Sequence, residues 1–143
     1  PHLLKYINSI ERVQKYFTKQ IPSLRQFSYP ERLAMIGLEP LEVRRLKCDL
    51  ILYYKSFHNL VALPYNLYFN VQSNFSQTRT GGNSLIPVLC NTNRFANDFF
   101  NRSVNCYNNL PLNVINSNSL SVFKNFLANF DFTNYIKCSF LQT

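Results

Sequence analysis

The stretch from Glu39 to Val61 most restricts how this chain can fold, because it is long and amphipathic and contains no glycine. Pro40 suits the first turn of a helix, where its missing N–H is no loss. At about 100° per residue, the large apolar side chains fall on one half of a helical wheel: Val43, Leu46, Leu50, Tyr53, Tyr54, Phe57, Leu60 and Val61. The opposite half carries the basic side chains of Arg44, Lys47 and Lys55. We therefore expect a core helix with a basic outer face.

Two further helices are predicted on the N-terminal side of this stretch. The first runs from about Leu3 to Lys19 and ends before Pro22. The side chains of this helix that are expected to face the core are Leu3, Tyr6, Ile7, Ile10, Val13 and Phe17. Ser28 and Glu31 have the spacing of a capping box, which predicts a short helix that Gly37 ends.

Two helices are also predicted on the C-terminal side. One runs from about Thr92 to Leu110 and stops before Pro111, and the last begins after a cap at Ser117 or Ser119. The inward side chains of the first of these are expected to be Phe95, Phe99, Phe100, Val104 and Tyr107.

The segment from about 63 to 87 lacks a helical pattern. Its prolines, its polar residues and the pair Gly81-Gly82 predict a long surface loop. The sequence therefore predicts an all-α fold, with about five helices in an orthogonal or bundle-like packing and one long irregular loop. The helical domain is predicted to span residues 1–130, followed by a tail over residues 131–143.

The charge balance favours an anionic partner. The chain carries 15 Lys and Arg against 7 Asp and Glu, a formal net charge of +8, and phosphate backbones attract such a chain. No apolar run reaches the roughly 18 residues of a membrane-spanning helix, so no membrane partner is expected. The cysteines stand singly, without the close pairs typical of zinc sites, which indicates reduced thiols in an intracellular protein; they are Cys48, Cys90, Cys106 and Cys138.

Short motifs follow one another along most of the chain. They are IERVQKYFTKQI (10–21), SYPERL (28–33), GL (37–38), LEVRRLKCDL (41–50), TRTGG (78–82), DFFNR (98–102), YNNLP (107–111) and SVFK (121–124). Their order resembles the C-terminal region of reverse transcriptases of non-LTR retrotransposons (LINE elements of the jockey-like kind). The resemblance covers roughly residues 3–128. Tyr107 departs from it, since the family usually has Trp there, and residues 89–97 carry only Arg94 where family members are often richer in basic residues.

The resemblance implies a thumb and post-palm piece of an RNA-directed DNA polymerase. The palm, with its metal-binding Asp pair and Mg²⁺, would lie upstream, so no cofactor is expected in this chain. The implied partners are RNA, DNA or an RNA–DNA hybrid, together with the upstream polymerase domain of the same polypeptide. The family implies a location in the nucleus and cytoplasm.

No catalytic residue or metal ligand is expected here. Polymerase chemistry needs clustered carboxylates that hold two metal ions about 3.5–4 Å apart, whereas the seven carboxylates of this chain are isolated among apolar or basic neighbours. Arg45 and Asp49, one helical turn apart, are expected to form an interior ion pair.

The candidate nucleic-acid-binding residues are basic: Arg12, Lys15, Lys19, Arg44, Lys47, Lys55 and Arg79. Rows of such residues contact phosphates and position a duplex without reading its sequence. The alternative is a solvated face with helical ion pairs such as Glu11–Lys15.

The sequence thus predicts a non-catalytic module that holds template–primer or element RNA. Two alternatives remain open. One is an interaction domain that docks on the polymerase core through Ile51, Leu52 and the aromatic tail. The other is a degenerate element remnant.

Overall fold

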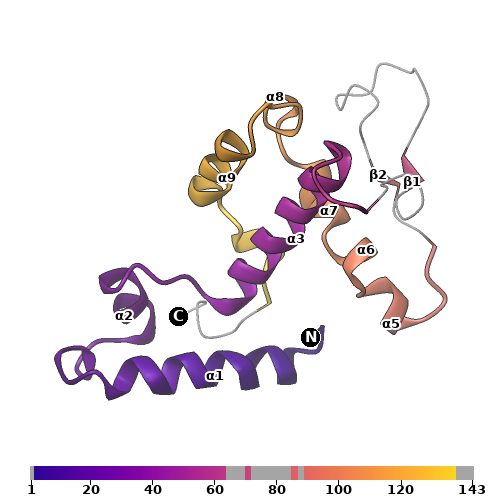
Figure 1. Ribbon diagram of the computed structural model, residues 1–143. Helices are drawn as coiled ribbons and strands as arrows, with labels where there is room; N and C mark the ends of the chain where they lie inside the picture. Colours follow the sequence, from indigo (N-terminus) through magenta and orange to yellow (C-terminus); the bar gives the residue numbers. More distant parts are fainter. Residues whose placement is uncertain (1, 64–69, 72–84, 87–88, 138–143) are drawn as a thin grey trace. The chain divides into compact units, whose positions relative to one another are not determined.

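The computed structural model describes residues 2–63, 70–71, 85–86 and 89–137, and these are predominantly helical (Figure 1). The all-α class is therefore confirmed. The chain divides into two compact units, which are described separately; one is Pro1–Leu46 with Asp131–Thr143, and the other is Lys47–Phe130. Most of the predicted long loop lies outside the described residues.

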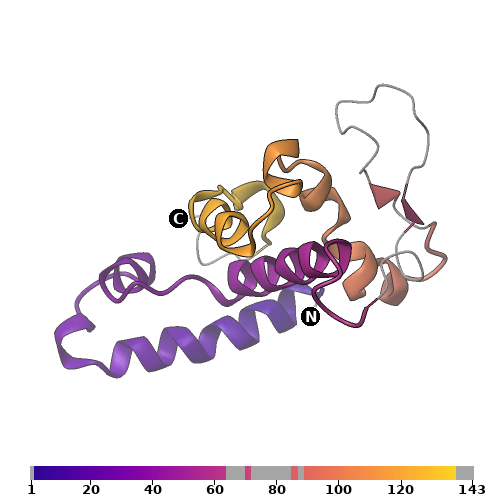
Figure 2. The same ribbon diagram turned by 45° about the horizontal axis from the view of Figure 1, so that its top comes forward.

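The first unit begins with three helical elements, α1 (Leu4–Gln20), the 3-10 turn η1 (Pro22–Leu24) and α2 (Tyr29–Met35), followed by the start of α3 (Leu41–Phe57). Figures 1 and 2 show α2 beside the C-terminal end of α1. The predicted capping box is present, and the Ser28 N–H donates to the Glu31 carboxylate at 2.7 Å. Hydrogen bonds from Ser28 also lower the pKa of Glu31. Gly37 follows α2 with a positive φ of 64°, as expected for a residue that ends a helix.

The apolar face predicted for α1 is mostly exposed, so that expectation is wrong. Of its six side chains only Ile7 is buried. The other five, which we call the α1 stripe, have these exposed fractions: Leu3 50%, Tyr6 52%, Ile10 46%, Val13 69% and Phe17 70%. The face that packs holds Ile7, Glu11 and Thr18. Periodicity alone could not show this, because two of these three residues are polar.

The second unit contains the rest of α3 and a series of short elements: β1 (Asn70–Val71), β2 (Leu85–Ile86), α5 (Asn93–Ala96), α6 (Phe99–Arg102), α7 (Val104–Asn108), α8 (Leu112–Ile115) and α9 (Leu120–Asn129). The two strands pair antiparallel, with Asn70 opposite Ile86. The cap of α9 is Ser119, whose hydroxyl accepts from the Ser121 N–H at 3.3 Å.

The single helix predicted over Thr92 to Leu110 is broken into α5, α6 and α7, so this prediction is wrong. The break has a local cause. The Asp98 carboxylate accepts the N–H of Asn101 at 3.1 Å and starts a new helix there. The Thr92 hydroxyl caps α5 in the same way. Short polar side chains that bond the nearby backbone compete with the continuation of a helix.

The middle of the apolar face predicted for α3 lies in the core of the second unit, whereas Leu60 of the same predicted face is 56% exposed and lies beyond the end of the helix. Leu50, Tyr53 and Tyr54 are buried. The Tyr54 ring stacks on Phe123 of α9 with 4.5 Å between centroids, and Tyr53 meets Tyr107 of α7 edge-on at 5.7 Å. Burial raises the pKa of both Tyr53 and Tyr107.

The residues after α9 return to the first unit. Phe132 is buried, and the turn η2 (Thr133–Tyr135) follows it. The Lys137 N–H donates to the Glu42 carboxylate at 3.0 Å, close to the start of α3. This bond ties residues far apart in the sequence into one unit.

The environments of two cysteines predict their reactivity. Cys48 is exposed, whereas Cys106 is buried and its burial raises the thiol pKa to about 12. Because the thiolate is the reactive form, iodoacetamide at pH 8 should modify Cys48 well before Cys106, as followed by peptide mass spectrometry. In urea the difference should disappear. Equal rates in the folded chain would contradict the described packing around α7.

Candidate nucleic-acid interface

Three basic side chains, which we call the α1 row, lie along one line of α1. Lys5, Arg12 and Lys19 are seven residues apart, so each lies about 10.5 Å beyond the last and the row is about 21 Å long. All three are exposed. The Lys5 ammonium lies 5.9 Å from the centroid of the Tyr6 ring. Lys5 was missing from the predicted set, although its seven-residue spacing from Arg12 could have revealed it.

Lys15 lies nearer the packed side of α1 than the α1 row. It is half-buried. Its carbonyl oxygen accepts from the Arg32 guanidinium at 3.3 Å and from the Thr18 hydroxyl at 3.1 Å. The structure therefore separates Lys15 from Arg12 and Lys19, with which the sequence had grouped it.

The basic residues predicted on α3 are also separated. Arg44 is exposed and belongs to the first unit, as the α1 row does. Lys47 and Lys55 are half-buried and belong to the second unit. Arg79 lies outside the described residues. The α1 row is thus the best-defined basic feature in the described chain.

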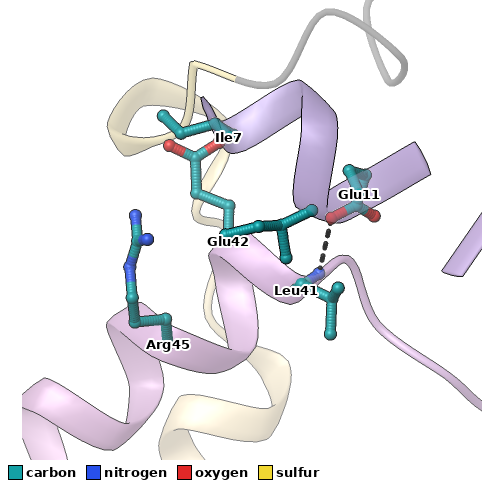
Figure 3. Close-up of a pocket in the computed structure, with 6 residues that line it drawn as sticks. Ile7, Glu11, Leu41, Glu42 and Arg45 are labelled. Atoms are coloured by element: carbon teal, nitrogen blue, oxygen red, sulfur yellow. Dashed lines mark hydrogen bonds between the residues drawn. The ribbon is translucent and has the colours of Figure 1, made fainter. Parts of the chain in front are cut away.

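The only acidic residue on α1, Glu11, has a buried and hydrogen-bonded side chain. Glu11 is 1% exposed. Its carboxylate accepts the O–H of Tyr29 and, at 3.0 Å, the N–H of Leu41 (Figure 3). Glu11 therefore links α1 to α2 and to the start of α3. No exposed carboxylate on the same helix weakens the field of the α1 row.

A half-open hollow of about 160 Å³ lies beside Glu11. Figure 3 shows Ile7 and Glu11 from α1 facing Leu41, Glu42 and Arg45 from α3. Ile10 completes the lining. The two carboxylates there are already bonded, Glu11 as described and Glu42 to Lys137.

An ion pair between the buried Asp49 and the partly exposed Arg102 organises the second unit. Arg102 of α6 donates two hydrogen bonds to the Asp49 carboxylate, each 2.6 Å long, and the Ser103 hydroxyl adds a third at 3.1 Å. The bond to Asp49 raises the pKa of Arg102. The sequence suggested Arg45 as the partner of Asp49; local spacing could not indicate Arg102, which lies 53 residues further on.

These contacts join the motifs on which the family resemblance rests. Glu11 and Thr18 stand in the first motif, and they bond Tyr29 and Arg32 of SYPERL. Asp49 of the LEVRRLKCDL motif pairs with the Arg that ends DFFNR. Folding contacts thus account for at least one polar residue in each of four motifs, and none of these contacts requires a ligand.

Neither a metal site nor a membrane span is found in the described part of the chain. No group of three or more His, Cys, Asp or Glu side chains there could hold a metal ion. Among the described helices, none has the length and apolar character needed to cross a membrane.

Comparisons of the chain with protein-family models, with curated proteins and with solved structures gave no match. The resemblance to LINE reverse transcriptases therefore stays a prediction that rests on the motifs themselves.

The role of Glu11 can be tested by unfolding. Glu11→Ala leaves the Tyr29 hydroxyl and the Leu41 N–H without their acceptor. Since each buried unsatisfied group costs about 1–3 kcal/mol, the free energy of unfolding in urea should fall by roughly 2–4 kcal/mol.

Glu31→Gln is the matched control, because glutamine preserves a capping box. It should leave the unfolding free energy almost unchanged. A small effect of Glu11→Ala, similar to that of the control, would show that Glu11 does not hold the three elements together.

Proposed function

We propose that this chain is a non-catalytic module that holds nucleic acid through its phosphates. The observation that carries the proposal is the α1 row, three exposed cations on one line of a helix whose only carboxylate is buried. The formal net charge of +8 supports attraction to a polyanion over a longer range.

The chemistry of such a row is electrostatic and independent of base sequence. Each phosphate that a Lys or Arg neutralises releases condensed counterions, so affinity falls as salt rises. Three contacts would give a slope of log K against log salt of about −2 to −3. Arg44, exposed in the same unit, is the next candidate contact.

The family resemblance supplies the proposed context. In it, the chain follows the palm of a LINE-type RNA-directed DNA polymerase and holds template–primer or element RNA. Mg²⁺ and the catalytic carboxylates would belong to that upstream domain. The docking alternative would use Ile51 and Leu52, which are both half-buried on α3, so we rank it second.

Fluorescence anisotropy with a labelled RNA–DNA hybrid, repeated across salt concentrations, tests the proposal. The unaltered chain should show the negative slope given above. Arg12→Glu combined with Lys19→Glu should make that slope shallower by about 2 and weaken binding at low salt, because two phosphate contacts are lost.

Lys124→Glu serves as the control for a single charge reversal, since Lys124 is exposed on α9 and belongs to the second unit. A single such change should have a clearly smaller effect than either single change in the α1 row. No binding at low salt by a folded chain would refute the proposal, and so would an equal loss with Lys124→Glu.

A further inference from the structure

The α1 stripe has no role in the packing or in the proposed function described so far. Its five members are 46–70% exposed, although they include two aromatic and three aliphatic side chains. Exposed apolar surface of this extent on one helix marks an interaction site.

The spacing of the stripe is that of a helix–helix seam. Leu3, Tyr6, Ile10, Val13 and Phe17 are separated alternately by three and four residues. This spacing repeats every 3.5 residues on average and keeps a narrow apolar line facing a partner helix. It is a narrower pattern than the broad apolar face with which a helix covers a globular core.

We propose that the α1 stripe is the contact surface for a second copy of this chain, which pairs through its own α1. The distribution of charge around α1 favours a second copy of the chain as the partner. The four side chains that flank the seam are uncharged, namely Ile7, Ser9, Gln14 and Tyr16. The α1 row lies roughly 140° away around the helix. The nearest cation is Lys5, whose ammonium lies 5.9 Å from the ring of Tyr6 near one end of the stripe. The side chains that flank Ile10, Val13 and Phe17 carry no charge, so two copies of a chain with a net charge of +8 can meet there without opposing like charges.

The stripe is also close to symmetric along the helix. Leu3 and Phe17 lie seven residues on either side of Ile10, and Tyr6 and Val13 lie four and three residues away. A two-fold axis near Ile10 would therefore place apolar side chains opposite one another in an antiparallel pair. Such self-complementarity is the requirement for the isologous interface of a symmetric dimer.

The hollow in the first unit adds a recess beside the seam. Ile10 belongs both to the α1 stripe and to the lining of the hollow. With about 160 Å³, the hollow is as large as engineered cavities of about 150 Å³ that accept a benzene ring. With the two-fold axis near Ile10, the side chains of the second copy that lie nearest to the hollow are those of Ile10 and Val13.

The expected dimer is weak. From the exposed fractions and the sizes of the five side chains, the pair would bury on the order of 1,000 Å² in total, at the lower limit of specific interfaces. We therefore expect a dissociation constant on the order of 10–100 µM.

Sedimentation equilibrium of the full chain, from about 5 to about 500 µM to span that range, is the test. The mean mass should rise from 16.8 kDa toward twice that value. Val13→Glu should weaken the association about tenfold or more, because two carboxylates would enter the seam. Val122→Glu, at an exposed position of α9 outside the stripe, should not.

Val13 is 69% exposed, so the variant should fold, and circular dichroism checks this. Phe17→Ser is a second variant that adds no charge and should also weaken the dimer. A monomer at every concentration would overturn the proposal and leave the α1 stripe to a different partner, such as an upstream domain. A dimer that resists both stripe variants would overturn it as well. Because the test involves no nucleic acid, its outcome is independent of the proposed function.

Discussion

The buried carboxylate of Glu11 decides how α1 is used. A carboxylate in the interior must find donors, because its desolvation is costly, and Glu11 finds them on Tyr29 and Leu41. These bonds fix the rotation of α1 about its axis. With that rotation set, Ile7 and Thr18 turn inward, and both the α1 row and the α1 stripe face outward. The binding surfaces proposed for this chain therefore depend on one polar contact beneath them.

This dependence explains which buried helix faces could be predicted from the sequence and which could not. Helical periodicity correctly predicted that Leu50, Tyr53 and Tyr54 of α3 are buried, and all three are apolar or aromatic, although Leu60 of the same predicted face is exposed. It failed for α1, where the side chains that fix the packing include Glu11 and Thr18. A wheel drawn from hydrophobicity assigns such residues to solvent, since it cannot show that their partners lie on other elements.

Local signals were reliable only where their partners are also local. The capping box of Ser28 and Glu31 spans three residues and is present. The helix break at Asp98 is also local, because the Asp98 side chain caps α6. The aromatic spacing across this position favours one continuous helix, and the structure follows the cap instead. The basic set was only partly grouped correctly, because exposure around a helix depends on its rotation. That is why Lys15 and Lys47 fall closer to packed surfaces than Arg12 and Arg44 do.

The ion pair of Asp49 and Arg102 has a consequence for how the second unit is assembled. It joins residues 53 positions apart, so the second half of α3 cannot complete its contacts until α6 has been synthesised. Closing so long a segment costs entropy, which slows folding of this unit relative to a helical bundle with local contacts. The entropic cost of closure grows only with the logarithm of the length of the enclosed segment, so doubling that length costs only about 0.6 kcal/mol more. Within the segment that the pair encloses, Leu85 is a fixed point, because it is 2% exposed and its N–H and C=O both bond the side chain of Asn108.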